Sequence, residues 1–193
     1  MPKIVDVKIV TFIPEKWINL LGQSVTDADH GVQFNGNNRG FTSVYGENFK
    51  TYQILSINTS DLSQNYYHEE TGQTIKRTWI TSPTNAYAYQ YDQVSTSCLS
   101  HTKDASGSDW VRYIMHGDCA NPLMDGAPAI NWEIKLTIHK DGTVHAYGDH
   151  DGYPNFEIYK SYDGGSWTKI YTKSHGSISN LGPGLDVHFD ETV

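Results

Sequence analysis

Alternation of apolar and polar residues is the feature that most constrains the fold of this chain. In "INWEIKLTIH" (130–139), every second residue is apolar, namely Ile130, Trp132, Ile134, Leu136 and Ile138. Successive side chains of a β-strand point to opposite faces of the sheet, so this pattern predicts a strand with one buried and one solvent-facing side. Helical periodicity is almost absent from the sequence. The chain is therefore expected to be all-β.

Turn residues divide the chain into about ten such strands. "KDG" (140–142) and "DGG" (163–165) predict hairpin turns, because glycine tolerates the positive φ that tight turns need. Only "KWINLLG" (16–22) suggests a short helix, after a first strand that Pro14 closes. Loops are expected at 22–38, 59–72, 99–108, 117–128 and 174–183. This spacing predicts a single domain over 1–193, either an antiparallel β-sandwich or a closed β-barrel, with minimal helix.

Composition excludes several classes of partner. The chain has 14 basic and 22 acidic residues among 193, a formal charge of −8. Phosphate binding needs concentrated lysine and arginine, so nucleic acid is not an expected partner. No apolar run approaches the roughly 20 residues of a transmembrane helix, and no basic amphipathic segment suggests a membrane surface. The 13 tyrosines are instead typical of β-sheet faces and binding surfaces.

The two cysteines, together with few lysines and many tyrosines, asparagines, glycines and serines, suggest an exported protein. Cys98 and Cys119 could form a disulfide, or both could be reduced and buried. The first residues, "MPKIVDVKIVTFIP", alternate and do not resemble a signal peptide. We therefore expect a secreted or cell-surface protein whose signal segment is absent from this sequence, or whose export route is unconventional.

The stretch "GDHDGYP" (148–154) allows three interpretations. It can be a strand-end turn whose aspartates hydrogen-bond neighbouring groups. It can be part of an active or ligand site that includes His150. Asp149 and Asp151 can also bind calcium as paired carboxylates before a flexible glycine, although a full calcium loop is absent. Calcium is the only cofactor that the sequence suggests, and no other is expected.

A second group of polar residues could support catalysis. His116 and Asp118, in "HGDCANPLMDGAP" (116–128), could orient a general base, and "STSCLSH" (95–101) offers nucleophiles. However, the chain has no G-x-S-x-G elbow and no H-E-x-x-H motif. If the protein is an enzyme, the candidate catalytic residues are Arg39, His116, Asp118, Asp149, His150 and Asp151.

Six motifs occur in order over nearly the whole chain. They are "TFIP" (11–14), "GNNRGF" (36–41), "NPL" (121–123), "PAINW" (128–132), "GDHDGYPNFEIY" (148–159) and "LDVHF" (185–189). Together they resemble the domain-of-unknown-function family 3238. The resemblance implies a bacterial origin, but it implies no particular activity, substrate or catalytic residue. Asn37 stands where the family pattern has an aspartate, so no carboxylate role is expected there.

Two of these motifs suggest contact between distant loops. Arg39 lies in a glycine-flanked turn, and a guanidinium held in this way commonly pairs with a carboxylate through two parallel hydrogen bonds. Asp149 and Asp151 are its expected partners. Such a pair could form part of a site, or it could simply hold two loops together.

These features favour a binding module for a surface ligand, which could be a glycan, a lipid or a host protein. The module could act alone or as a toxin component. Aromatic rings stack on sugar faces and amides hold hydroxyl groups, so the candidate ligand-binding residues are Asn38, Trp110, Tyr147 and Tyr153. A small hydrolase or toxin-type effector, and a structural protein without a site, are the alternatives. Convergence of the six catalytic candidates in one pocket would favour an enzyme, whereas aromatic residues aligned on an exposed face would favour a binding module.

Overall fold

The structure of the chain, a computed structural model, describes residues 1–19, 42–82, 85–94, 98–119, 130–152, 154–176, 185 and 187–193. Within these residues it contains eleven strands and no helix. The strands are β1 (Ile4–Asn19), β2 (Thr42–Asn58), β3 (Gln64–Ser82), β4 (Asn85–Val94), β5 (Leu99–Ser106), β6 (Trp110–Cys119), β7 (Ile130–His139), β8 (Val144–His150), β9 (Asn155–Tyr162), β10 (Thr168–Lys173) and β11 (Val187–Thr192).

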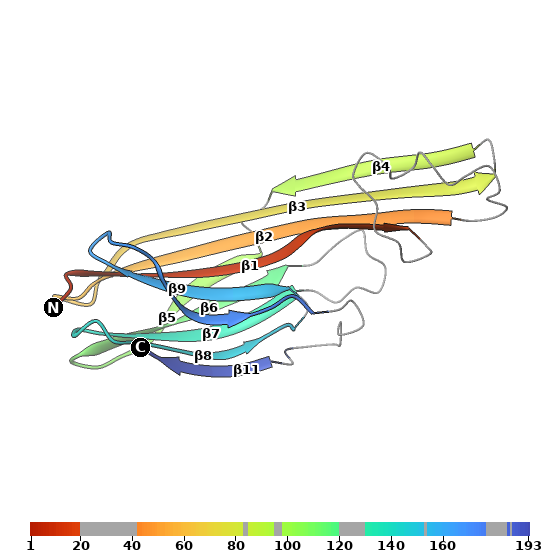
Figure 1. Cartoon of the computed structure of the whole chain (residues 1–193). Helices are drawn as coiled ribbons and strands as arrows, with labels where there is room; N and C mark the ends of the chain where they lie inside the picture. The colour runs from red at the N-terminus through yellow and green to blue at the C-terminus, as the bar shows by residue number, and fades with distance from the viewer. Residues whose placement is uncertain are drawn as a thin grey trace. The chain divides into compact units, whose positions relative to one another are not determined.

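The strands form two antiparallel sheets. One has the order β10-β9-β1-β2-β3-β4 and the other the order β11-β8-β7-β6-β5 (Figure 1). Neither order returns to its first strand, so both sheets are open in the part of the chain that the structure describes. The all-β prediction is confirmed, and of its two architectures the β-sandwich is the one that fits.

The contacts divide the chain into two compact units. The first comprises Met1–Phe12, Thr51–Thr71 and Ser95–Val193, and the second comprises Ile13–Lys50 and Gly72–Val94. In the second unit, β3 pairs with β4 from Gly72↔Val94 to Ile80↔Ala86, followed by a register shift. The expectation of one domain over the whole chain stays a prediction. The side-chain contacts described below belong to the first unit.

The core of the first unit follows the alternation seen in the sequence. On β7, Trp132, Ile134, Leu136 and Ile138 are fully buried, whereas Glu133 on the other face is exposed. The other fully buried apolar residues lie on strands of both sheets: Val5, Val7, Ile9, Leu55, Ile57, Val111, Met115, Val144, Ala146, Phe156 and Ile158. The two sheets therefore bury one apolar face each against the other.

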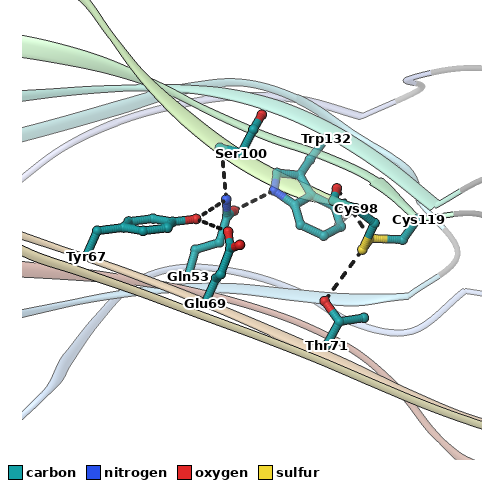
Figure 2. Close-up of a disulfide and its surroundings, with 8 residues drawn as sticks. All are labelled: Gln53, Tyr67, Glu69, Thr71, Cys98, Ser100, Cys119 and Trp132. Atoms are coloured by element: carbon teal, nitrogen blue, oxygen red, sulfur yellow. Dashed lines mark hydrogen bonds between the residues drawn. A yellow bond between two sulfur atoms is a disulfide. The ribbon is translucent and has the colours of Figure 1, made fainter. Parts of the chain in front are cut away.

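A buried amide connects the two sheets (Figure 2). The indole Nε1 of Trp132 on β7 donates to Oε1 of Gln53 on β2, at 3.0 Å. The amide nitrogen of Gln53 donates to the Tyr67 hydroxyl on β3, at 3.1 Å, and to the Ser100 carbonyl on β5, at 2.9 Å. Tyr67 in turn donates to Glu69, at 2.7 Å. The indole of Trp132 and both ends of the Gln53 amide thus have partners inside the core, as buried polar groups require.

Cys98 and Cys119 form a disulfide, which decides between the two states that the sequence allowed. Cys98 directly precedes β5 and Cys119 ends β6, so the bridge joins two neighbouring strands. The Asp118 amide donates to the Cys98 carbonyl at 2.8 Å, beside the bridge. The Thr71 hydroxyl lies 3.5 Å from the Cys98 sulfur (Figure 2).

Both predicted hairpin turns are present. Gly142 has φ +93°, and Asp163 and Gly164 have φ +51° and +74°. The Asp163 carboxylate accepts hydrogen bonds from the amides of Lys3 and Ile4, each at 2.8 Å. The turn after β9 thus also holds the start of β1.

The predicted helix at 16–22 is wrong over 16–19, which continue β1 as a strand. Pro14 does not close the first strand either. A proline lacks an amide donor, but a strand tolerates it where that donor has no ladder partner. A single helical turn also needs packing to be stable, because helix nucleation is unfavourable.

Two predicted loops are also wrong. Part of 59–72 belongs to β3, which begins at Gln64, and most of 99–108 is β5. Both segments are polar because they bury few side chains. On β5, a strand at the edge of its sheet, only Leu99 is buried. Charged residues are typical of such edges because they discourage pairing with other chains.

Candidate functional site

The outer face of the five-stranded sheet carries most of the sequence-predicted polar residues that the structure describes. Strand register places four ionisable residues in one row across it. His116 on β6 lies opposite Glu133 on β7, Glu133 opposite Asp149 on β8, and Asp149 opposite His188 on β11. His188 Nδ1 lies 2.8 Å from the Asp149 carboxylate. The exposed Asp118 lies two residues further along β6 on the same face.

The described residues of this row do not gather three possible metal ligands at one point. Among the described residues, no group of three or more histidine, cysteine, aspartate or glutamate side chains is placed to hold a metal ion. The two aspartates of "GDHDGYP" also have different surroundings. The Asp149 side chain is 46% exposed, whereas Asp151, just beyond the end of β8, is 2% exposed. Calcium binding by these residues stays a prediction.

His150 points away from the outer face and into the core. Its ring stacks on Phe156, with centroids 4.3 Å apart and an interplanar angle of 3°. Its Nδ1 lies 2.8 Å from the Asp151 carbonyl, and its Nε2 lies 2.6 Å from the Tyr171 hydroxyl. Because a carbonyl can only accept, Nδ1 carries the proton. In the neutral ring Nε2 then accepts from Tyr171.

A second group of side chains lies together on the outer face. We call Trp110, Arg112, His145 and Tyr147 the aromatic–arginine patch. Arg112 follows Trp110 by two residues on β6 and reaches across β7 to the Tyr147 hydroxyl on β8, with Nη1 at 3.4 Å. Its guanidinium lies 5.9 Å from the Trp110 ring centroid. The His145 ring stacks on Tyr147 with centroids 4.6 Å apart.

Carboxylates on both sides hold this patch in place. Asp104 on β5 accepts from Arg112 Nε at 2.6 Å, and Asp190 on β11 lies 2.8 Å from His145 Nε2. The hydrogen bond to Asp104 raises the pKa of Arg112, which is therefore always charged. The Trp110 ring lies directly against Gly107, where a Cβ would come within 2.3 Å of the indole nitrogen. The patch is thus a preorganised surface of rings with one fixed cation.

The sequence-predicted residues therefore divide into three groups. Trp110, Tyr147, His116, Asp118 and Asp149 share the outer face. His150 and Asp151 are buried. Asn38, Arg39 and Tyr153 lie outside the described residues, as does the proposed contact of Arg39 with the aspartates.

The sequence reasoning missed Arg112, His145, Asp104 and His188. Arg112 could have been found, because "WVRYIMHGD" alternates and places it on the same face as Trp110 and His116. The contacts of His145 and His188 depend on the pairing of β8 with β11. No local pattern specifies that pairing.

Gly148 in the "GDHDGYP" stretch should not tolerate a side chain. It has φ +148°, and a Cβ there would lie 2.2 Å from the Glu133 carbonyl oxygen on β7. We expect Gly148→Ala to lower the free energy of unfolding by about 3 kcal/mol, from backbone strain and a clash with rigid backbone. Urea denaturation measures this. Gly72→Ala is the control, since Gly72 has no heavy atom within 4 Å of its Cβ position and no positive φ. Equal losses in the two variants would contradict the expectation.

The comparisons with known proteins give one finding. A family model described as "Protein of unknown function (DUF3238)" matches residues 1–191. No curated protein matches the chain. Among the described residues, the structure has no helix of the length and apolarity that a membrane span needs.

Proposed function

This chain belongs to the DUF3238 family of proteins of unknown function, and we propose that it is an exported binding module that holds a surface glycan on the aromatic–arginine patch. One observation carries the proposal. Trp110 and Tyr147 are both half-buried on the outer face of the five-stranded sheet, and the charged Arg112 contacts both of them.

The patch has the chemistry that a sugar needs. Sugar rings present C–H groups that stack on aromatic faces, and their hydroxyls take hydrogen bonds from charged donors. The patch extends from β6 to β8, a width of about 10 Å because neighbouring strands lie about 4.8 Å apart. This width is comparable with the length of a disaccharide. The carboxylates that hold Arg112 and His145 can also accept hydrogen bonds from sugar hydroxyls.

The disulfide supports an exported location. Cys98 and Cys119 are bridged, and such bridges persist mainly in oxidising compartments. The formal charge of −8 is also compatible with an extracellular location, because a net charge far from zero keeps a protein soluble.

The enzyme alternative has less support. Catalysis needs its groups to converge on one reacting position. The side chains of His150 and Asp151 are buried, whereas His116, Asp118 and Asp149 lie on the outer face. The arrangement of the described residues thus favours a binding surface of half-buried aromatic rings over a catalytic centre.

Binding to a panel of bacterial and host surface glycans tests the proposal. We expect saturable binding to at least one glycan, and we expect Trp110→Ala to weaken it about tenfold, because one ring contact is worth about 1.4 kcal/mol. Calorimetric titration with the glycan identified by the panel measures the affinity of each variant.

Tyr66→Ala is the matched control. Tyr66 is 44% exposed but lies on β3, in the other sheet, so its removal should leave the affinity unchanged. Equal weakening by the two substitutions would contradict a site on the patch. Binding to lipid vesicles or to a protein, with no glycan bound, would reject the glycan as ligand.

A further inference from the structure

A shallow depression lies at the edge of the sandwich, apart from the aromatic–arginine patch. Its volume is about 370 Å³, and it is lined by Lys169, Ile170, Tyr171 and Thr172 of β10 and by Glu191 of β11. β10 is the last strand of its sheet and β11 the last strand of the other. A volume of this size is within the range of small-molecule sites.

The Tyr171 side chain is held from two directions. Its ring stacks on Phe189 of β11, with centroids 4.2 Å apart and an interplanar angle of 19°. Its hydroxyl lies 2.6 Å from Nε2 of the buried His150. The phenol that lines the depression is therefore fixed before any ligand arrives.

The edge of β10 suits a small molecule better than an added strand. Its pairing with β9 shifts register between Lys169 and Tyr171, which makes Ile170 a bulge. Bulges and lysines at a sheet edge disfavour the addition of another strand, and bulges commonly occur next to binding sites because they redirect side chains. Lys173, the last residue of β10, adds a second edge lysine.

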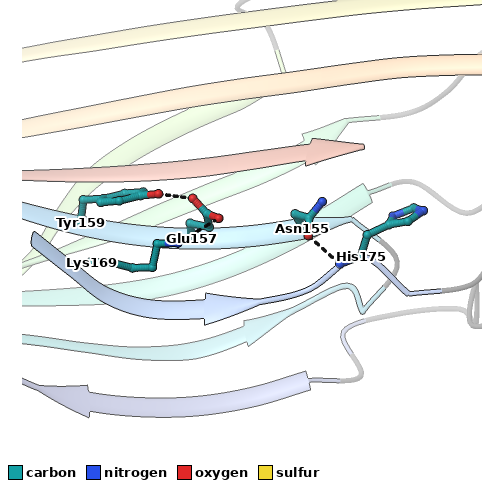
Figure 3. A network of polar contacts seen from close by, with 5 residues as sticks. All are labelled: Asn155, Glu157, Tyr159, Lys169 and His175. Carbon is teal, nitrogen blue, oxygen red and sulfur yellow. Dashed lines mark hydrogen bonds and ion pairs between the residues drawn. The ribbon is translucent and has the colours of Figure 1, made fainter. Parts of the chain in front are cut away.

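The charges around the depression are unbalanced. Lys169 Nζ lies 3.3 Å from a carboxylate oxygen of Glu157 on β9, which also accepts from Tyr159 (Figure 3). The hydrogen bond to Glu157 raises the pKa of Lys169. Glu191 makes no ion pair with any residue that the structure describes. Among the described residues, Lys169 is thus paired with Glu157, and the Glu191 carboxylate is the charge of the depression that has no ion-pair partner.

We propose that this depression binds a small ligand carrying a protonated amine, of the amino-sugar class. The ammonium group would pair with Glu191 and lie near the Tyr171 ring, an arrangement that favours cations. The ligand's hydroxyls would hydrogen-bond the Thr172 hydroxyl, and its apolar face would pack on Ile170. This site does not depend on the glycan proposed for the aromatic–arginine patch.

Titration of the full chain with D-glucosamine and with N-acetyl-D-glucosamine tests the proposal. The two sugars differ in charge because acetylation removes the ammonium group. We expect glucosamine to shift the backbone amide resonances of β10 and β11 saturably, and N-acetylglucosamine to bind at least about tenfold more weakly. Equal binding of the two sugars, or no saturable response to glucosamine, would overturn the proposal.

Two glutamates provide matched variants. Glu191→Gln keeps the shape of the side chain and removes its charge, so it should weaken glucosamine binding about tenfold. Glu70→Gln makes the same change at an exposed carboxylate on β3, which does not line the depression, and should leave the binding unchanged. Trp110→Ala should also have no effect, which separates this site from the aromatic–arginine patch. Retained affinity in Glu191→Gln with a native melting temperature would reject Glu191 as the amine's partner.

Discussion

Replacement of Trp132 by alanine is expected to lower the free energy of unfolding by about 3–5 kcal/mol, the range measured for large aromatic residues in cores. The side chain is fully buried and packs edge-on against Phe156, with ring centroids 6.0 Å apart. It also lies against Gly117 on β6, where a Cβ would come within 2.3 Å of the ring. The alanine variant therefore leaves a cavity that the rigid neighbouring strands cannot fill.

The hydrogen bond from the indole adds to this loss. Without Trp132 Nε1, the Gln53 carbonyl oxygen loses its donor inside the core. An unsatisfied buried acceptor costs about 1–3 kcal/mol. Trp132→Phe helps to separate the two contributions, because it removes the donor but keeps most of the ring volume. We expect it to lose about half as much stability as Trp132→Ala.

Chemical denaturation of the three proteins measures these differences, and Glu133→Ala is the control. Glu133 is the next residue on β7 and lies on the opposite, exposed face. Its substitution should change the free energy of unfolding by about 0.5 kcal/mol or less. A similar loss of unfolding free energy in Trp132→Ala and Glu133→Ala would show that both faces of β7 are buried. That result would contradict a sandwich with one solvent-facing side on this sheet.

The sequence specified strands whose two faces differ in polarity. The alternation in β7 correctly placed Trp132, Ile134 and Leu136 in the core. It could not identify β5, because an edge strand with one neighbour buries too little to need apolar residues. The continuation of β1 past Pro14 was missed for a related reason. Whether a proline ends a strand depends on its ladder partner, and the partner is set by tertiary structure.

The orientation of His150 could have been predicted from the sequence. In "VHAYGDH" (144–150), the alternation that turns Val144 and Ala146 into the core also turns His150 there. The sequence interpretation grouped this histidine with its two aspartates because they are adjacent in the chain. Strand geometry separates Asp149 from His150, since neighbours in a strand point to opposite faces.

The candidate sites were harder to predict because they combine distant strands. The aromatic–arginine patch brings Trp110 and Arg112 of β6 together with Tyr147 of β8. Composition suggested the aromatic residues, but only the sheet order shows which of the tyrosines and tryptophans share a face. The depression at β10 and β11 joins the last strands of two different sheets, and nothing in the local sequence indicates that Glu191 lies near Tyr171.

Removal of the disulfide is the second change expected to have a large effect. Replacement of both Cys98 and Cys119 by alanine should lower the free energy of unfolding by about 3 kcal/mol, because the unfolded chain regains the entropy of an open loop. The two cysteines are 21 residues apart in sequence. Denaturation of the double variant, compared with the oxidised and the reduced wild-type chain, measures the effect.

The folded strands themselves should survive this change. β5 and β6 remain paired from Leu99↔Gly117 to Ser106↔Val111, so the hairpin is closed by its ladder as well as by the bridge. The double variant should therefore keep the native circular dichroism spectrum and match the reduced wild-type chain in stability. The unfolded, unreduced protein should contain no titratable thiol, and two thiols would show that the bridge is absent. A stability difference between oxidised and reduced chains would link the fold to an oxidising compartment, because the same sequence would be less stable wherever thiols are kept reduced.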